Sequence, residues 1–453
     1  MFNLPKEIIN IFEIFKKNNL EIYLVGGSVR DLLLKKEPTN WDFTTNADPK
    51  EIQKLFSSSF YNNNYGTVSI SINSSNIVEI TPFRKESDYQ DFRHPEKIEW
   101  AKTLEEDLKR RDFTINAIAY DGEKIIDIFQ GQNDLKNKII KAVGNPDVRF
   151  QEDALRLIRA VRFASQLGFF IEEKTRKSIE KNAYLIKKIS WERIRDEFLK
   201  ILKSDHPSEG ILFLKNTKLL HYILPELDVC FLIPQKSPKR HHIYDVGTHL
   251  VMSLKYCQSN DEITRFATLI HDIGKAKTFK KDEKTGLITF YNHEVVGKKL
   301  AEKIADRFKL SNKQKEKLVR LVQYHQFTVS EIQTDKAIRR FIRQVGKEYL
   351  QDILDLRFAD RVGSGAKPDS WRFKLFRKRL VEVQKEPFKI TDLKINGNDV
   401  MKILNIKPGP QVGKILKEIF DKVIEKKLEN NREILLKEIE KIKILSLTRS
   451  GQK

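Results

Sequence analysis

A glycine pair near the N-terminus has the composition of a phosphate-binding turn. The apolar run at residues 21–25 leads into Gly26 and Gly27, and a second apolar segment follows at residues 32–34. Glycines between a buried strand and a helix start let backbone N–H groups approach a phosphate at the positive end of the helix dipole. Arg30, one turn further on, can add a charge-assisted hydrogen bond to the same anion. An ordinary tight turn is the alternative for the glycine pair alone.

Three polar residues on the following strands have the types that bind a metal ion. Asn40 and Asp42 stand two positions apart. Alternate residues of a strand face the same side, so their oxygens would form a hard site for Mg²⁺ beside the turn. Glu79 belongs to a later apolar strand, where a buried carboxylate needs a partner. That partner is a metal ion or, just as readily, an arginine.

A third group offers hydrogen-bonding side chains to a planar ligand. Residues 110–117 read RRDFTINA, and residues 152–163 open a helix in which Asp153, Arg156 and Arg159 recur every three positions. Side chains spaced in this way share a helix face. An Asp beside an Arg presents an acceptor and donors that can read the Watson-Crick edge of a base. The alternative is a salt bridge on a solvated helix.

The histidines are concentrated in the middle of the chain. Five of the nine lie between residues 241 and 293. His249 precedes the neighbours His271 and Asp272 by the length of a helix, and Asp360 follows. Imidazole nitrogens with carboxylates bind Mn²⁺, Mg²⁺, Fe or Ni²⁺, and such a centre activates water for attack on a phosphate. The sequence therefore predicts a second metal centre.

Two kinds of element must position these groups. Short β-rich runs bounded by Gly, Asn, Ser or Pro predict strands at residues 21–25, 41–45, 67–73 and 76–83. After Pro146 a 3.6-residue period predicts helices, as at residues 152–166, 189–202 and 263–270. We therefore expect an α+β head followed by all-helical domains. Polar breaks at residues 234–240 and 363–370 mark boundaries, and a lysine-rich helical tail runs from about residue 412 to 443.

The composition favours a polyanionic partner. The 453 residues include 84 Lys and Arg against 63 Asp and Glu, and a net charge of +21 favours nucleic acid. A lysine-rich coding bias is the alternative for part of that charge. No run approaches the ~18 apolar residues of a membrane span, and the first 20 residues predict an amphipathic helix rather than a signal peptide. We expect a cytoplasmic protein without membrane contact, in which Cys230 and Cys257 are reduced thiols.

Taken together, these segments resemble the class II CCA-adding enzymes, members of the tRNA nucleotidyltransferase and poly(A) polymerase superfamily with a polymerase-β-like head. Five segments occur in the family's order: residues 26–31 (GGSVRD), 40–42 (NWD), 110–117 (RRDFTINA), 152–156 (EDALR) and 190–194 (SWERI). The resemblance implies that Asp153 and Arg156 act as a protein template that selects CTP and then ATP. It implies catalytic roles for Asp42, the residue-40 position and Glu79, with Mg²⁺ in the head. The positions expected to contact the incoming nucleotide are Gly26, Gly27, Arg30, Arg111, Asp112, Asn116, Arg159 and Arg162.

One position departs from the family pattern. The family has Asp-x-Asp on the metal strand, whereas this chain has Asn40 where the first Asp belongs. An Asn oxygen can ligate a metal but brings no negative charge, and two-metal phosphoryl transfer relies on carboxylates to balance both ions. We expect a large loss of nucleotidyl transfer relative to Asn40→Asp. The alternative is that Asp42 and Glu79 suffice.

Residues 83–95 are similar to the flexible loop that helps this family switch from C to A addition. Its charged residues are Arg84, Glu86, Asp88, Asp91 and Arg93. Enzymes that add only CC tend to lack this loop, so its presence favours full CCA addition. A charged surface loop is the alternative.

The histidine region resembles the HD phosphohydrolase domain. His249, His271, Asp272 and Asp360 match its basic ligand set, while His293 and His325 match the additional histidines of two-metal versions. Lys275 matches a residue that assists the phosphate. This resemblance implies hydrolysis of a phosphoester, such as a 2′,3′-cyclic phosphate at a damaged tRNA end.

The sequence thus predicts an α+β protein with four parts. These are a polymerase-β-like nucleotidyltransferase head (residues 1–122), a helical neck and body (123–235), an HD domain (241–365) and a helical tail that binds tRNA (370–453). The expected activity is template-independent addition of CCA to the tRNA 3′ end from CTP and ATP. The alternatives are a poly(A) polymerase or A-adding enzyme, and a tRNA-binding HD phosphohydrolase with an inactive head. The sequence does not predict the oligomeric state.

Overall fold

The computed structural model describes residues 2–62, 66–71, 77–89, 95–235, 244–368, 370–384, 390–425 and 427–450. The chain forms two compact units. The first comprises residues 1–323 and 359–366, and the second comprises residues 324–358 and 367–453. The four domain ranges expected from the sequence are a finer division than these two units and remain predictions.

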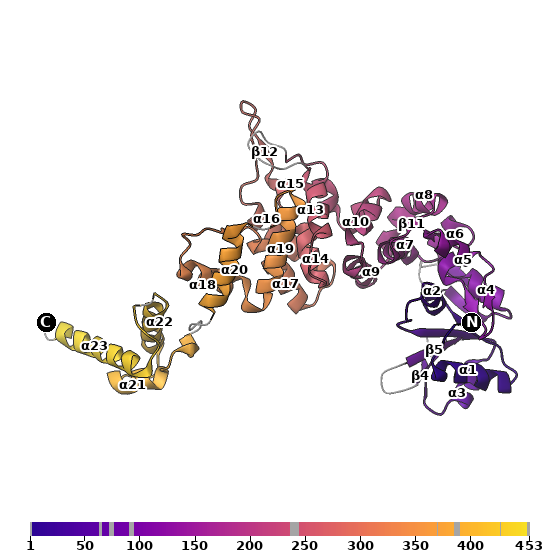
Figure 1. Ribbon diagram of the computed structural model, residues 1–453, viewed down its shortest axis with the longest axis horizontal. Coiled ribbons are helices and arrows are strands. Elements are labelled where there is room, and N and C mark those ends of the chain that lie inside the picture. Colours follow the sequence, from indigo (N-terminus) through magenta and orange to yellow (C-terminus); the bar gives the residue numbers. More distant parts are fainter. Residues whose placement is uncertain are drawn as a thin grey trace. The chain divides into compact units, whose positions relative to one another are not determined.

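The head is built on a seven-stranded mixed sheet with the order β3-β4-β5-β2-β1-β8-β9. Its strands are β1 (Ile22–Val25), β2 (Trp41–Thr45), β3 (Ser59–Asn62), β4 (Thr67–Ser71), β5 (Ile77–Pro82), β8 (Ala119–Tyr120) and β9 (Ile125–Ile126). β1 runs antiparallel to β2 and β8, whereas β2 and β5 are parallel. Parallel neighbours need a crossover, and α3 (Pro49–Leu55) with β3 and β4 supplies it. Helices α1 (Lys6–Lys17) and α3 pack on this sheet (Figure 1).

Local sequence explains how the head elements start and which face they bury. Asp48 and Glu51 form a capping box at the start of α3, with Pro49 in the first turn. The apolar face of α1 buries Ile8 and Phe15, as an amphipathic helix should. The predicted strands all form, and the predicted α+β class is confirmed. A separate hairpin, β6 (Arg84–Tyr89) with β7 (Pro95–Trp100), follows β5.

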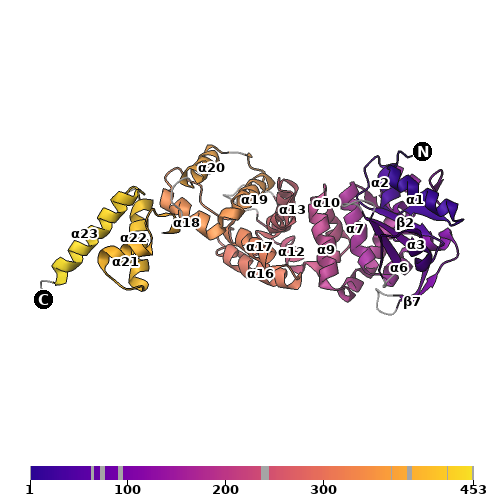
Figure 2. The ribbon, with the colours of Figure 1, turned by 90° about the horizontal axis from the view of Figure 1, so that it is seen from below.

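The rest of the first unit is mainly helical, as predicted. From the head through the neck and body its helices are α2 (Gly27–Leu33), α4 (Leu104–Lys109), η1 (Thr114–Asn116), α5 (Gly131–Lys136), α6 (Pro146–Glu152), α7 (Leu155–Leu167), α8 (Glu173–Asn182), η2 (Ala183–Lys188), α9 (Trp191–Lys203), α10 (Pro207–Asn216), α11 (Leu219–Ile223) and α12 (Pro225–Cys230). The histidine region contains α13 (Val246–Lys255), α14 (Glu262–Ile270), α15 (Lys275–Thr278), α16 (His293–Arg307) and α17 (Asn312–Tyr324). Helices α7, α9 and α10 lie side by side (Figure 2).

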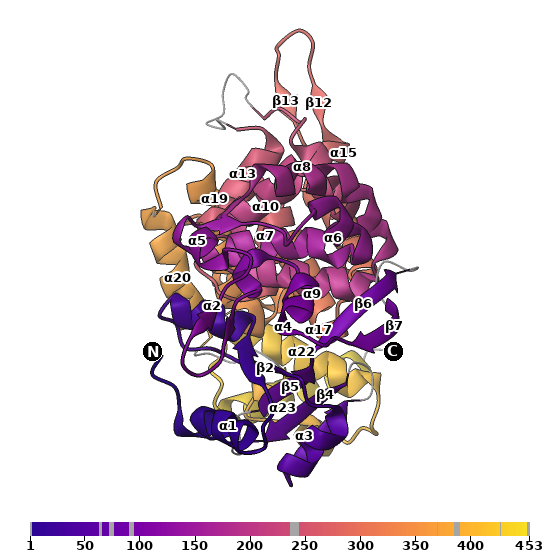
Figure 3. The same ribbon diagram turned by 90° about the vertical axis from the view of Figure 1, so that its right-hand side faces the viewer.

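Two short strand pairs interrupt this helical part. β10 (Ile139–Ile140) pairs in parallel with β11 (Phe170–Ile171). β12 (Lys280–Lys281) and β13 (Ile288–Thr289) form a hairpin that projects from the helices in Figure 3. Both cysteines are buried and free, in agreement with the prediction of reduced thiols. Among the described helices, none combines the length and the apolar character needed to cross a membrane.

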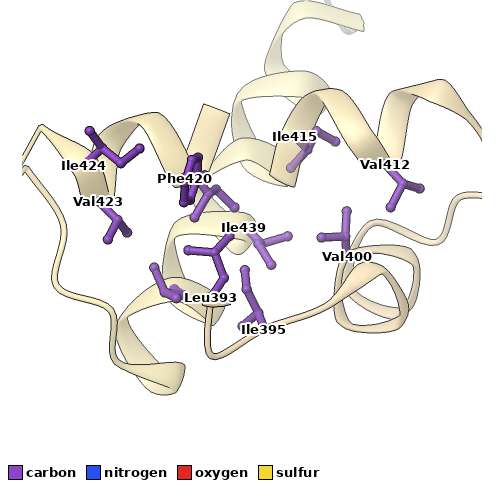
Figure 4. Packing of buried hydrophobic residues seen from close by; sticks show 11 residues of the cluster. Leu393, Ile395, Val400, Val412, Ile415, Phe420, Val423, Ile424 and Ile439 are labelled. Atoms are coloured by element: carbon purple, nitrogen blue, oxygen red, sulfur yellow. The ribbon is translucent and has the colours of Figure 1, made fainter. Parts of the chain in front are cut away.

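The second unit has its own apolar core at its C-terminal end. It contains α18 (Asp335–Val345), η3 (Lys347–Tyr349), α20 (Trp371–Val383), η4 (Ile390–Asp392), α21 (Gly397–Leu404), α22 (Pro410–Ile424) and α23 (Arg432–Ser450), and the N-terminal part of α19 (Leu350–Gly363). Val400, Phe420 and Ile439 come from α21, α22 and α23 and point toward one another (Figure 4). The predicted lysine-rich helical tail, residues 412–443, falls on α22 and α23, which pack on α21.

We expect Ile439→Ala to destabilise this C-terminal core by about 2–5 kcal/mol, because it removes a fully buried side chain and leaves a cavity. Hydrogen exchange should show lost protection in α21, α22 and α23, with protection of the head sheet unchanged. Lys437→Ala, at an exposed position of the same helix, is the matched control. Equal protection in the two variants would contradict the assignment of Ile439 to a core.

Candidate nucleotide and metal sites

The glycine turn joins β1 to α2 in a conformation that requires glycine. Gly26 has φ +71°, in the left-handed region. A Cβ at Gly26 would also lie 3.1 Å from Nη1 of Arg111. Gly26 therefore lets the chain turn and leaves room for the Arg111 guanidinium.

Ser28, inside this turn, fixes the backbone of the metal strand. Its hydroxyl donates to the Asn40 carbonyl at 3.0 Å and accepts from the Asp42 N–H at 3.0 Å. Asn40 is exposed and immediately precedes β2, so the prediction that it lies in the strand is wrong. The cause is that its carbonyl bonds to the Ser28 side chain rather than to a neighbouring strand.

Asp42 and Glu79 are neighbours across parallel strands. They are register partners on β2 and β5. Burial raises the pKa of the Asp42 carboxyl and the nearby charge of Glu79 adds to this, while Arg111 and Arg30 oppose it. The prediction that Glu79 is buried is wrong: β5 buries Val78 and turns Glu79 to solvent. Two carboxylates held close together, one of them partly buried, suit a cation.

A pocket of about 740 Å³ lies between the head and the neck helices. Eight arginines and one lysine line it, against four carboxylates. All the predicted nucleotide and metal residues of the head and neck except Glu79 are among its lining residues: Gly26, Gly27, Arg30, Asn40, Asp42, Arg111, Asp112, Asn116, Asp153, Arg156, Arg159 and Arg162. The fold thus brings together residues that are more than 130 positions apart in sequence.

Asp107 forms ion pairs with two of the pocket arginines, Arg110 and Arg111. Its carboxylate is fully buried and accepts from Arg110 at 2.7 Å and from Arg111 at 3.1 Å. Burial alone would raise the pKa of Asp107, but the two guanidinium charges lower it. Asp107 therefore stays ionised and fixes both arginines.

Asp112 links the head to the neck helix. Arg159 of α7 donates to it through Nε at 2.9 Å and Nη2 at 2.5 Å, and Asn116 donates at 3.2 Å. Asn116 in turn accepts from Arg30 at 2.8 Å. Burial would raise the pKa of Asp112, but Arg159 lowers it to about 2.

Asp153 and Arg156 occupy the junction between α6 and α7. Asp153 is not inside a helix as predicted; its side chain accepts from the Leu155 N–H at 3.0 Å and its backbone is extended. Arg193 reaches Asp153 at 3.4 Å. Arg156 is buried and bonds to Glu152 at 2.6 Å, which argues against the alternative of a solvated helix.

Arg162 and Glu197 form a third buried pair, between α7 and α9, at 3.0 Å. Burial lowers the pKa of Arg162 to about 10. The charge of Glu197 raises this pKa, and the charge of Arg159 lowers it further. Arg111 Nε and Arg193 Nη1, two buried nitrogens of the pocket arginines, have no hydrogen-bond partner within the described residues. An anion in the pocket would find donors there.

The histidine region forms a second, separate cluster. His249 of α13 and His271, which follows α14, approach each other with Nε2 atoms 3.3 Å apart. Asp360 Oδ1 lies 3.3 Å from His249 Nε2, and Asp272 Oδ2 lies 3.4 Å from it. Burial would lower the pKa of His271, but Asp272 and Asp360 raise it to about 10. His249, His271 and Asp272 are close enough to share one cation.

The other ring nitrogens of these histidines are already engaged. His271 Nδ1 lies 2.8 Å from the Thr268 carbonyl, and His293 Nδ1 lies 2.9 Å from the Phe290 carbonyl. A carbonyl only accepts, so each Nδ1 carries a proton, and each Nε2 faces the Asp272 carboxylate.

The remaining predicted residues of this region lie as follows. His293 Nε2 is 3.1 Å from Asp272 Oδ1, and Lys275 Nζ is 2.6 Å from Asp272 Oδ2. His325 follows α17 and is buried in the second unit. The fold thus places Asp272 between His249, His293 and Lys275.

Only part of the predicted flexible loop, residues 83–95, lies within the described residues. Arg84, Glu86 and Asp88 lie on β6, with Arg84 paired in register to Trp100. Asp91 and Arg93 lie outside the described residues.

Comparison with known proteins agrees with this fold and site. Residues 22–141 match the model of the Poly A polymerase head domain, residues 168–231 that of an RNA and SrmB-binding site of polymerase A, and residues 278–439 that of tRNA nucleotidyltransferase domain 2. The fold and the matched head define a nucleotidyltransferase of the polymerase superfamily.

The relatives identify the family. The CCA-adding enzyme of Ligilactobacillus salivarius is 34% identical over 445 residues, 97% of this chain and 98% of that protein. That of Enterococcus faecalis is 33% identical over 443 residues, 95% and 94% of the two chains. The crystal structure of the Bacillus stearothermophilus CCA-adding enzyme with CTP matches with a TM-score of 0.72 at 25% identity, covering 99% of this chain and all of that one. The chain belongs to the family of CCA-adding enzymes, which confirms the resemblance.

Several residues that hold the pocket side chains in place were not predicted from the sequence. Ser28, Asp107, Glu152 and Glu197 each fix a predicted residue without being one. Asp107 stands three and four positions before Arg110 and Arg111, a helical ion-pair spacing that could have identified it. Glu197 gave no such signal, because its partner Arg162 lies on another helix.

We expect Asp112→Asn to lower the free energy of unfolding by about 2–4 kcal/mol at pH 7, because Arg159 loses its buried charged partner. The folded pKa of Asp112 is about 2, below the ordinary value of 3.8. The carboxylate therefore stabilises the fold above about pH 4, and this stabilisation is lost as the pH falls through 2.

Urea unfolding at pH 7, 5 and 3 checks this prediction. The difference between wild type and Asp112→Asn should be equal at pH 7 and 5 and fall to roughly half at pH 3. Asp196→Asn removes an exposed ion pair with Arg195 and should change stability by less than about 1 kcal/mol. A pH-independent difference would show that the Asp112 charge is not the stabilising feature.

Proposed function

We propose that this chain adds CCA to the 3′ end of tRNA without a nucleic-acid template, using CTP and ATP. The observation that carries the proposal is the head pocket, in which twelve residues that the resemblance assigns to nucleotide or metal binding line one strongly basic cavity. Nine basic side chains against four carboxylates suit a triphosphate. The net charge of +21 suits tRNA as the second substrate.

The arginines bind and orient the triphosphate. Arg30, Arg111, Arg159 and Arg162 supply fixed guanidinium forks, and Gly26 and Gly27 bring backbone N–H groups to the same place. The buried Arg111 Nε, which has no hydrogen-bond partner within the described residues, supports this role.

Asp153 and Arg156 read the base. Arg193 holds Asp153, while Glu152 and the Arg149 and Arg110 carbonyls hold Arg156, so both side chains are fixed at the pocket wall. A fixed acceptor beside fixed donors can select cytosine and then adenine once the pocket has adjusted.

The head residues fit a divalent metal ion. Asp42, Glu79 and the Asn40 side-chain oxygen supply hard oxygen ligands, and the burial of Asp42 is compensated by a cation. Bound Mg²⁺ would neutralise developing charge during phosphoryl transfer. The tRNA 3′-oxygen attacks the α-phosphate, its proton leaves to solvent or base, and pyrophosphate departs. Positioning by the arginines supplies the rest of catalysis.

We expect Asn40→Asp to raise CCA addition by roughly 100-fold, because it restores a carboxylate ligand that balances metal charge. The measurement is incorporation of labelled CTP and ATP, with Mg²⁺, into tRNA lacking its 3′ end. Asn46→Asp, on the loop after β2 outside the pocket, controls for the added charge.

Equal rates for wild type and Asn40→Asp would show that Asn40 is a sufficient ligand. A homopolymer made from ATP alone would identify the alternative, a poly(A) polymerase or A-adding enzyme. An absence of any incorporation by Asn40→Asp would favour a tRNA-binding protein with an inactive head.

A second function is supported by the histidine cluster: we infer a metal-dependent phosphohydrolase of the HD type. His249, His271, Asp272 and Asp360 form the proposed ligand set, and His293 is a proposed additional ligand. The protonated Nδ1 atoms of His271 and His293 turn each Nε2 toward Asp272, where a cation would lie. Mn²⁺, Mg²⁺, Fe and Ni²⁺ are compatible with this donor set, and a 2′,3′-cyclic phosphate at a damaged tRNA end is the proposed substrate.

We expect Asp272→Asn to lower bound metal and hydrolysis of a nucleoside 2′,3′-cyclic phosphate by about 100-fold while CCA addition continues. Asp42→Asn should lower CCA addition while hydrolysis of the cyclic phosphate continues. Metal content measured by mass spectrometry, with both assays, separates the two sites. Loss of both activities in either variant would contradict two independent centres.

The remaining assignments complete the proposal. The tail, residues 370–453, is proposed to hold the tRNA elbow through backbone phosphates, since α22 and α23 present exposed lysines such as Lys414, Lys417 and Lys437. The ranges 1–122, 123–235 and 241–365 are the proposed head, neck with body, and HD domain. The proposed location is the cytoplasm.

A further inference from the structure

Phe163 of α7 stands among three arginines of the head pocket. Its ring centroid lies 4.1 Å from the Arg162 guanidinium carbon, 5.4 Å from that of Arg159 and 5.3 Å from that of Arg30. All three distances fall within cation–π range. Arg30 comes from α2 of the head, whereas the other two arginines share α7 with the ring.

The ring itself is fixed from the head side. Phe163 is only 6% exposed and packs edge-to-face on Phe113, with centroids 5.7 Å apart. Phe113 directly follows Asp112, the partner of Arg159. Two adjacent head residues therefore hold the neck helix, one through a charge and the other through a ring.

Each of the three guanidinium groups also has a carboxylate partner. Arg159 pairs with Asp112 and Arg162 with Glu197, while Arg30 pairs with Asp31 at 2.8 Å. Like charges gathered in one pocket repel one another, and the electron-rich face of an aromatic ring offsets part of that repulsion without neutralising them. A further carboxylate in place of the Phe163 ring would compete with the triphosphate for the arginines.

We propose that Phe163 is a positioning residue for nucleotide binding, which holds the Arg30, Arg159 and Arg162 guanidinium groups at the spacing that a triphosphate needs. This inference rests on the proposed function of the head pocket. It assigns no contact between the ring and the reacting atoms. Phe163 acts through the arginines and therefore on the affinity for nucleotide more than on the chemical step.

The test compares Phe163→Met, which removes the aromatic face but keeps an apolar side chain, with Phe163→Tyr, which keeps the ring. Phe163→Met should raise KM for CTP and for ATP by roughly 5- to 30-fold, with a smaller change in kcat. Phe163→Tyr should stay within about 3-fold of wild type. If Phe163→Met does not fold, Phe163→Leu replaces it in the comparison with Phe163→Tyr.

Binding of tripolyphosphate, measured by calorimetry without tRNA or metal, provides a readout that does not depend on catalysis. Its affinity should fall in Phe163→Met by a factor similar to the change in KM. Phe198→Met is the matched control, because Phe198 is fully buried against Phe266 and Phe308 in the same unit but does not line the pocket. It should lose thermal stability without losing tripolyphosphate affinity.

The outcomes separate this inference from the function on which it rests. Equal affinities of wild type and Phe163→Met for tripolyphosphate would overturn the role of Phe163 and leave the proposed function of the pocket standing. Equal losses of affinity in Phe163→Met and Phe163→Tyr would overturn it as well, since the ring would not be the cause. A wild type and an Asn40→Asp variant that neither bind tripolyphosphate nor incorporate CMP would overturn the proposed function together with this inference.

Discussion

The head pocket depends on pairing arginines with carboxylates that are removed from water. Asp107 holds Arg110 and Arg111, Asp112 holds Arg159, and Glu197 holds Arg162. A buried carboxylate that loses its partner is costly, so each pair constrains both members. Arginine suits this arrangement because its planar fork can bond to a carboxylate with some nitrogens and present others to a ligand. The pocket is positive and rigid for the same reason.

The two chemical centres of the first unit have opposite electrostatic characters. The head pocket gathers guanidinium groups, with an excess of cations over carboxylates, and so attracts an anion. The second centre surrounds Asp272 and Asp360 with imidazole rings whose Nδ1 protons point away. Its Nε2 atoms and carboxylate oxygens face one another, and this donor set suits a cation. A single fold can hold both because each centre is built by its own helices.

Features with local determinants are predictable from the sequence. The glycine turn and the strand at residues 41–45 follow from adjacent residues and agree with the structure, whereas Asn40, expected in the same strand, precedes it. Glu79 was placed in the interior because its neighbours are apolar, yet β5 alternates and leaves Ile77 exposed as well. Asp153 was placed in a helix because the 3.6-residue period continues through it, but its carboxylate caps α7 instead. The register of β2 against β5 and the pairing of Arg162 with Glu197 join distant segments, so no local pattern could reveal them.

The place of residue 40 is set by its backbone rather than by its side chain. The Ser28 hydroxyl bonds to the Asn40 carbonyl and to the Asp42 N–H, so an Asn and an Asp at position 40 would hold the same position. The two side chains have nearly the same size, but Asp carries a negative charge and only accepts hydrogen bonds, whereas Asn is neutral and also donates. An added carboxylate beside Asp42 and Glu79 would raise the pKa of Asp42 further in the absence of a cation, and would bind a cation more tightly in its presence. In the proposed function, Asn40 would lower the electrostatic cost of the metal-free head and weaken the site for the metal ion that supports phosphoryl transfer. Arg30, Arg111 and Arg159 are untouched by this exchange, so the proposed nucleotide binding would be separable from nucleotidyl transfer.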